Sequence, residues 1–284
     1  MLKPTICVPR NESGAEHATI TKNKESRLAR VLGLRDLTLL VVSAVIGSGI
    51  FVVPGSVLSS VHNSPKAALA VWLSGGILSL LGALTYGELT AMKPDTGGLY
   101  IYIRERFGPF PAFLFGWTLF FVISNGSIAA LAVAFTQHLT EFISMSPVSQ
   151  KCVSIGTITI IGVVNIWGTR RSVSLQNVAT LLKVTAIMLM AGVLVVCGAY
   201  HGRLFHEPDV VAKAPLLSGF MVAMVSVLWA YEGWQWATFN AGETINPQRN
   251  YPRAFALGSV ILIGVYLMAN VGYLSALGPK GVAN

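Results

Sequence analysis

The chain has 284 residues, of which 53% are hydrophobic and only 11% are charged, and its formal net charge is +8. Soluble domains carry about 25% charged residues, so this composition excludes an ordinary soluble domain and indicates a membrane protein with several spans. The basic residues fall between apolar segments instead of forming one patch, so nucleic acid is not expected as a partner.

Residues 1–30 are polar, contain few large apolar side chains, and are predicted to form a disordered tail. The segment that follows, 37–61, has no charged residue and is long enough to cross a bilayer as a helix, which takes about 20 residues. Its middle is Gly47-Ser48-Gly49, and glycines are poor helix formers. We therefore expect two half-helices, at about 37–46 and 51–60, joined by an unwound link.

An unwound link in the middle of a membrane leaves backbone N–H and C=O groups that lipid cannot satisfy. The link must therefore face protein, water or a bound molecule. The second half-helix directs its N-terminal amides and the positive end of its dipole at the gap, which suits a carboxylate. The alternative is an unbroken glycine-rich helix that packs closely against a neighbour.

Six further apolar spans are expected after the first, at 67–87, within 107–140, and at 152–168, 175–200, 215–241 and 254–277. The sixth span of the seven contains the sequence Trp229-Ala230-Tyr231-Glu232-Gly233-Trp234, which places an acid and a glycine in mid-bilayer. Two interrupted spans, five apart, point to an all-α transporter built from inverted repeats. The first repeat would cover about 36–200 and the second would begin in 215–284. A complete version needs about ten spans, so the remainder is expected to be missing.

Orientation follows from the basic residues. Fourteen of the 20 Lys and Arg residues fall on the same side of the expected spans as the N-terminus, and five fall on the other side. The positive-inside rule therefore places the N-terminus in the cytoplasm.

Lys183 is the only basic residue inside a span, where a charge costs about 2.5–3.5 kcal/mol on insertion scales and is usually functional and paired. It could act as a fixed cation or a proton carrier; alternatively, its side chain could extend to the interface. Glu232, in the second break, could contact a substrate or lie in a hydrated vestibule. The three cysteines and the histidines show no ligand spacing, so no metal, cofactor or enzymatic activity is expected.

Several motifs together resemble the amino acid–polyamine–organocation superfamily, and specifically its L-type amino acid transporter branch with the bacterial exchangers. They are Ile46-Gly47-Ser48-Gly49-Ile50-Phe51, Tyr86-Gly87-Glu88-Leu89, Ala230-Tyr231-Glu232-Gly233-Trp234 and Glu243-Thr244-Ile245-Asn246-Pro247. The resemblance implies a LeuT-like fold. It also implies sodium-independent transport of neutral L-amino acids by alternating access in the plasma membrane, as an exchanger or a proton-linked permease.

The resemblance also implies a substrate site. The amides of Ser48 and Gly49 would hold the substrate carboxylate, and Gly47 lies beside them in the same link. Carbonyls at the two breaks would accept the α-ammonium group. The expected site residues are Val45, Ile46, Gly47, Ser48, Gly49, Trp229, Ala230, Tyr231 and Glu232, with Lys183 at the position where sodium-coupled relatives hold an ion.

The sequence departs from the family pattern at two places, and it allows two alternatives to transport. Trp229 stands where these transporters usually have a gating phenylalanine, which bears on the shape of the gate. The loop 141–150 has no cysteine, so no disulfide-linked heavy chain is expected. The alternatives are a membrane subunit that binds or senses amino acids without moving them, and a non-functional fragment of a permease.

Overall fold

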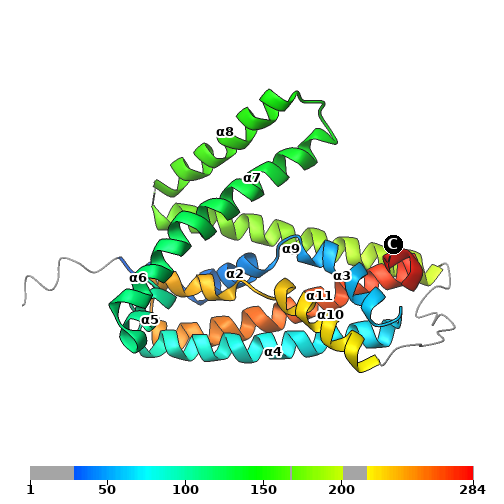
Figure 1. The fold of residues 1–284 in the computed structure, drawn as a ribbon, viewed down its shortest axis with the longest axis horizontal. Helices are drawn as coiled ribbons and strands as arrows, with labels where there is room; N and C mark the ends of the chain where they lie inside the picture. Colours follow the sequence, from blue (N-terminus) through cyan, green and yellow to red (C-terminus); the bar gives the residue numbers. More distant parts are fainter. Residues whose placement is uncertain (1–28, 167, 201–215, 284) are drawn as a thin grey trace, which may run out of the picture.

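The computed structural model describes residues 29–166, 168–200 and 216–283, so most of the expected disordered tail, 1–28, lies outside the described residues. The part that is described consists of helices joined by short links, which confirms the expected all-α fold (Figure 1). In chain order, the elements are α2 (Leu34–Val45), α3 (Gly49–Ser60), α4 (Pro65–Met92), α5 (Leu99–Phe107), α6 (Pro109–Thr118), the π-helix η1 (Leu119–Ser124), α7 (Asn125–Thr140), α8 (Pro147–Ile166), α9 (Thr169–Tyr200), α10 (Leu216–Ala230), the 3-10 helix η2 (Trp234–Glu243) and α11 (Pro247–Ala283).

Five helical stretches of the described chain are long and apolar enough to cross a membrane, and the bent pair α2–α3 makes a sixth. The five are α4, the continuous run Pro109–Thr140, α8, α9 and α11. The remaining expected span corresponds to α10, which has 15 residues and continues after a break into η2. All seven expected apolar spans therefore have a helical counterpart.

The ends of the long helices follow from local sequence signals. The Ser64 hydroxyl caps α4 by accepting a hydrogen bond from the Ala67 amide at 3.4 Å, and Pro65 occupies the first helical position, where its missing N–H costs nothing. α11 begins at Pro247, whose fixed φ and missing N–H suit the first position of a helix. Near its end, α11 bends at Gly278, whose φ of 69° suits glycine.

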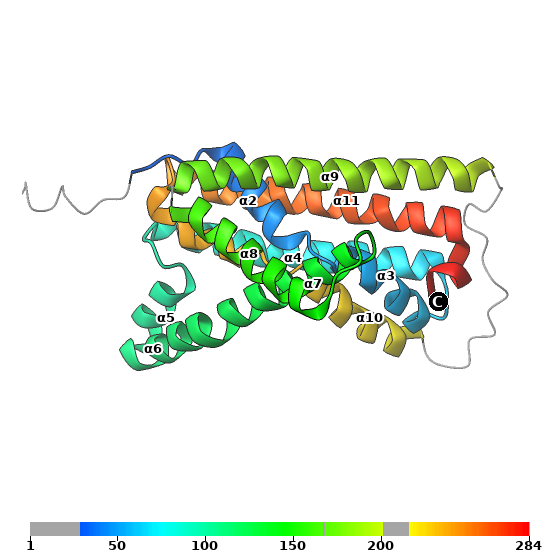
Figure 2. The same cartoon turned by 90° about the horizontal axis from the view of Figure 1, so that it is seen from above.

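The core lies between α2, α3, α4, α9, α10 and α11. Its largest fully buried side chains are aromatic, namely Trp72, Tyr231, Tyr251, Tyr266 and Phe255. Helices α9 and α11 run side by side along the length of the molecule (Figure 2). They approach closely because Gly272 faces Ala191, where a side chain at position 272 would lie 3.0 Å from the Ala191 Cα atom.

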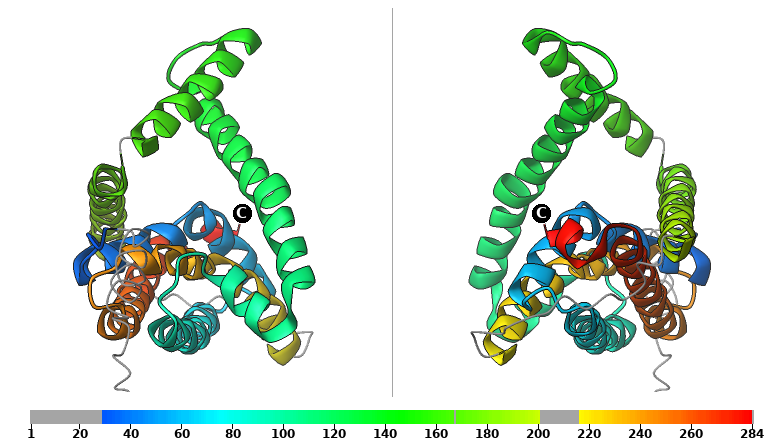
Figure 3. Two further views of the ribbon diagram at one scale, coloured as in Figure 1. Left: turned by 90° about the vertical axis from the view of Figure 1, so that its left-hand side faces the viewer. Right: turned by 90° about the vertical axis from the view of Figure 1, so that its right-hand side faces the viewer.

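The hairpin formed by α7 and α8 stands away from this core (Figure 3). Its two helices are held together by buried hydroxyl groups, because the Thr136 and Ser154 oxygens lie 2.7 Å apart and the Ser154 hydroxyl also donates to the Ala132 carbonyl at 3.3 Å. Many of the remaining side chains of the hairpin are exposed and apolar, such as Leu131, Phe135 and Ile160.

A parallel backbone bridge between Leu32 and Thr244 joins the chain just before α2 to the chain just after η2. The Val31 amide donates to the Glu243 carbonyl at 2.8 Å, and the Ile245 amide donates to the Leu32 carbonyl at 2.9 Å. The starts of α2, α9 and α11 and the end of α4 lie at this same end of the bundle (Figure 1).

Candidate functional site

The first expected break is present between α2 and α3. Helix α2 ends at Val45 and α3 begins at Gly49, and the two axes are bent by 52°. Ile46 leaves the helix with an extended ψ of 97°. Gly47 and Ser48 are exposed, whereas Gly49 is buried. The break therefore presents the N-terminus of α3, whose first amides have no acceptor within the helix, beside two solvent-accessible residues.

The second break lies between the end of α10 at Ala230 and the start of η2 at Trp234. Within it, Gly233 has φ 127° and ψ −22°, a conformation that residues with a side chain rarely adopt. A Cβ atom at Gly233 would collide with the Ala44 carbonyl oxygen and would lie 2.9 Å from its carbon. The backbone of the second break therefore packs directly on the end of α2.

The two breaks also meet at Gly49 and Ala230. A Cβ atom at Gly49 would lie 3.1 Å from the Ala230 Cβ atom and 3.2 Å from its Cα atom. Glycine is thus required at two points, Gly233 within the second break and Gly49 at the start of α3, for the two interrupted spans to lie against each other. The structure brings together the two segments that the sequence marks as interrupted, although they are some 180 residues apart.

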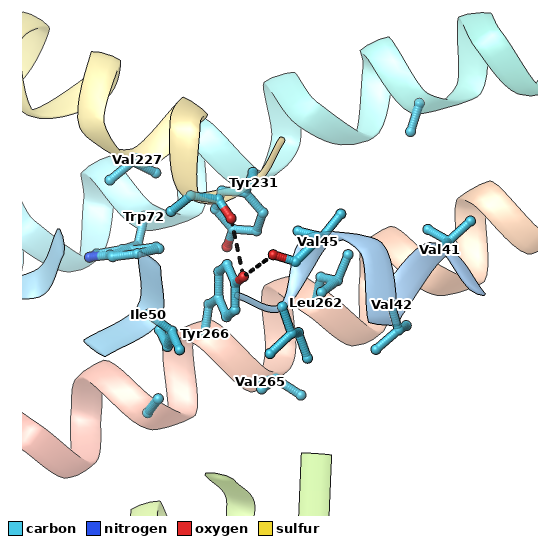
Figure 4. Close-up of a cluster of buried hydrophobic side chains, with 14 of the residues drawn as sticks. Val41, Val42, Val45, Ile50, Trp72, Val227, Tyr231, Leu262, Val265 and Tyr266 are labelled. Carbon is cyan, nitrogen blue, oxygen red and sulfur yellow. Dashed lines mark hydrogen bonds between the residues drawn. The ribbon is translucent and has the colours of Figure 1, made fainter. Parts of the chain in front are cut away.

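A single buried tyrosine connects the two breaks (Figure 4). The Tyr266 hydroxyl group, from α11, lies 3.2 Å from the Val45 carbonyl oxygen and 3.1 Å from the Ala230 carbonyl oxygen, and its one hydrogen is shared between them. The ring is fully buried against Trp72 and Tyr231, with centroids 5.5 and 4.9 Å away. Sequence analysis missed Tyr266 because a lone tyrosine in an apolar span carries no pattern.

Lys183 reaches the first break from α9. Its Nζ atom donates a hydrogen bond of 2.7 Å to the Ile46 carbonyl oxygen. The side chain is half-buried and is directed at the unwound link, in contrast to the alternative of a lysine that extends to the membrane interface. A fixed ammonium group therefore occupies one acceptor position at the broken end of α2.

The expected site residues fall into two groups by exposure. Gly47, Ser48, Trp229 and Glu232 are exposed, and the Trp229 side chain retains 59% of its accessible surface. Val45, Ile46, Gly49, Ala230 and Tyr231 are buried, so they can offer a guest backbone groups at most. The Glu232 carboxylate accepts a hydrogen bond from the Gln235 side chain at 3.0 Å. Among the described residues, no three His, Cys, Asp or Glu side chains are grouped as metal ligands.

Unwound backbone at two adjacent points offers both kinds of partner that a zwitterion needs. The N-terminus of α3, which directly follows the exposed residues Gly47 and Ser48, supplies N–H donors and a favourable dipole for a carboxylate. Carbonyl oxygens at the ends of α2 and α10 supply acceptors for an ammonium group. Those of Val45, Ile46 and Ala230 each accept one bond within the protein, and a carbonyl oxygen has two lone pairs.

The chain is similar in sequence to known membrane proteins. The amino acid permease family model matches residues 32–284. The human b(0,+)-type amino acid transporter 1 is 32% identical over 89% of this chain and 53% of its own length. The serine/threonine exchanger SteT of Bacillus subtilis is 33% identical over 89% of this chain and 57% of its own length. The human large neutral amino acids transporter small subunit 2 is 30% identical over 95% of this chain and 50% of its own length.

The chain thus spans about half the length of the curated relatives that it matches. The family match nevertheless covers both breaks, Lys183 and Tyr266, and extends over nearly all of the described residues. The resemblance inferred from the sequence motifs is confirmed: this chain belongs to the amino acid permease family.

Proposed function

We propose that this chain carries the substrate site of a sodium-independent transporter of neutral L-amino acids. The observation that carries the proposal is the direct contact of the two interrupted spans at their breaks, at Gly233 with Ala44 and at Gly49 with Ala230. The amides of Ser48 and Gly49 hold the substrate carboxylate, and free lone pairs on the carbonyls of the two breaks hold its α-ammonium group. Zwitterion recognition by backbone groups does not depend on which side chain the amino acid carries.

The position of Lys183 supports sodium independence. Its ammonium group lies 2.7 Å from the Ile46 carbonyl oxygen, an acceptor that a bound cation would otherwise use. Two like charges in a region shielded from water repel each other strongly. The protonated lysine would therefore take the place of a coupling ion at this carbonyl.

The preference for neutral side chains is supported by the charges at the two breaks. The Lys183 ammonium group is hydrogen-bonded to the Ile46 carbonyl, and the Glu232 carboxylate accepts a hydrogen bond from Gln235. Both charged side chains at the breaks therefore already have partners within the protein. Trp229 lies close to Gly49, where a Cβ atom would be 3.7 Å from its ring, so the aromatic ring is placed to cover an apolar side chain.

Transport would proceed by alternating access, in which two repeats, residues 36–200 and a second that begins in 215–284, rock around the site. Exchange is the favoured mode because one of the matched relatives is described as an exchanger. In this proposal the protein lies in the plasma membrane, and its N-terminus is in the cytoplasm. That orientation is supported by the basic residues near the bridged end of the bundle, such as Lys93, Arg170 and Arg253.

The test is uptake of labelled neutral amino acids into proteoliposomes that contain the 284-residue chain, in sodium-free buffer with and without internal amino acid. Gly49→Leu should abolish uptake, because the added side chain pushes on the backbone of Ala230. Gly126→Leu, on α7, is the matched control, since nothing lies within 4 Å of its Cβ position.

Uptake by Gly49→Leu equal to that of the wild type would contradict the proposed site. A second candidate, amino acid binding without movement, is favoured by the presence of both breaks within the described chain. Saturable binding together with no flux would establish that candidate in place of transport, and the absence of both would reject the two together.

A further inference from the structure

A serine on α4 bridges the second break. The Ser79 hydroxyl group donates to the Tyr231 carbonyl oxygen at 3.3 Å and accepts a hydrogen bond from the Trp234 indole nitrogen at 3.0 Å. Tyr231 follows the last residue of α10, and Trp234 is the first residue of η2. One hydroxyl group therefore holds the chain on both sides of the point where the helix is interrupted.

The Trp234 indole ring, which donates this hydrogen bond to Ser79, also packs on the same face of α4. A Cβ atom at Gly82 would lie 3.2 Å from the Trp234 ring, and the ring centroids of Tyr86 and Trp234 are 5.0 Å apart. Ser79, Gly82 and Tyr86 follow the i, i+3, i+7 spacing of one helical face. α4 thus presents a continuous surface on which Trp234 rests.

The hydrogen bonds of Ser79 differ from those of other hydroxyl groups on α4. The Thr85 hydroxyl donates to the Leu81 carbonyl at 3.0 Å and the Thr90 hydroxyl to the Tyr86 carbonyl at 2.7 Å, both one turn back in their own helix. That is the ordinary use of Ser and Thr in a helix. Ser79 instead satisfies a carbonyl that the break has deprived of its helical donor, 152 residues along the chain.

We propose that Ser79 is a positioning residue of the substrate site. By fixing the Tyr231 carbonyl and the Trp234 indole relative to each other, it sets the separation between the end of α10 and the start of η2. That separation determines where the carbonyls of the second break point. The inference rests on the proposed function for the identification of the substrate site. The two hydrogen bonds of Ser79 are observed in the structure whatever that function is.

The experiment compares the wild-type chain with Ser79→Ala, which removes both bonds, and with Ser79→Thr, which keeps a hydroxyl group. Thr85→Ala is the matched control, because it removes a hydroxyl group from the same helix that serves only its own backbone. For each variant, backbone hydrogen exchange of residues 231–236, affinity for a labelled neutral amino acid, and thermal unfolding are measured in detergent.

In Ser79→Ala, exchange at residues 231–236 should become about tenfold faster and amino acid affinity about tenfold weaker, as expected for the loss of two hydrogen bonds. Ser79→Thr should recover most of both effects, and Thr85→Ala should leave both unchanged. The free energy of unfolding should fall more in Ser79→Ala than in Thr85→Ala, because Ser79→Ala leaves the Tyr231 carbonyl and the Trp234 indole N–H without their partner.

Exchange at residues 231–236 that stays at the wild-type rate in Ser79→Ala would overturn the proposal, and so would an equal acceleration over the whole chain. If the wild-type chain binds no amino acid, the proposed function fails. The exchange measurement then still decides whether Ser79 holds the break.

Discussion

Gly233→Ala tests the contact between the two breaks, because Gly233 combines a positive φ with a close approach to the backbone of α2. The native φ of 127° is strained for alanine, at a cost of about 1–3 kcal/mol. The new Cβ atom would collide with the Ala44 carbonyl oxygen and lie 2.9 Å from the Ala44 carbon and 3.3 Å from the Val45 Cα atom. All three are backbone atoms of α2, so they cannot rotate away as a side chain could.

Carbon atoms normally approach to about 3.5–4.0 Å, so the two breaks must separate by roughly 0.5–1 Å to admit the methyl group. A displacement of about 1 Å at a site that relies on orientation can cost about 100-fold. We therefore expect amino acid affinity to fall about 100-fold. Strain and overpacking together should lower the free energy of unfolding by about 2–6 kcal/mol.

The assay combines binding of a labelled neutral amino acid with denaturant unfolding of the purified chain in detergent. Gly264→Ala is the control, because it lies in α11 with nothing within 4 Å of its Cβ position. It should bind normally and be slightly more stable, since alanine is favoured over glycine inside a helix by about 1 kcal/mol. Wild-type affinity and stability in Gly233→Ala would refute the direct packing of the two breaks.

Two further substitutions test the groups that hold the carbonyls of the breaks. Tyr266→Phe should lower the free energy of unfolding by about 1–3 kcal/mol, because two buried acceptors lose their donor. Tyr273→Phe, on the same helix, should be nearly neutral, since its hydroxyl group has no partner in the described structure; equal effects in the two variants would contradict the bridging role. Lys183→Ala should weaken amino acid binding in sodium-free buffer by about tenfold or more, because it removes a charged hydrogen bond to Ile46. Lys151→Ala, at an exposed site, should bind normally, and an unchanged rate and pH dependence of uptake in Lys183→Ala would exclude a role for the lysine in transport.

The sequence predicts the structure best at positions where its residues are incompatible with a continuous helix. Gly47-Ser48-Gly49 and Glu232-Gly233 contradict a continuous membrane helix, and both predicted interruptions are present in the structure. The predicted start of the second half-helix was two residues late, because Gly49 is already helical and packs against Ala230. Glycine lowers helix propensity without specifying where a helix resumes; tertiary contact decides that.

Residues that act across long sequence separations could not be predicted. Ser79 and Tyr266 are single polar residues in apolar helices, and nothing in their own spans distinguishes them from Thr85 or Tyr273. Their partners are backbone carbonyls, which every residue has and which therefore leave no mark in the sequence. Only the packing of α4 and α11 against the breaks reveals the roles of Ser79 and Tyr266.

The short bridge between Leu32 and Thr244 has a mechanical consequence. It ties the outer end of α2 to the outer end of η2, while α3 packs on α10 at the opposite end of the bundle. The interrupted spans thus form two pairs of half-spans, α2 with η2 and α3 with α10. A rearrangement that moves α2 away from η2 would therefore have to break the backbone hydrogen bonds from Val31 to Glu243 and from Ile245 to Leu32.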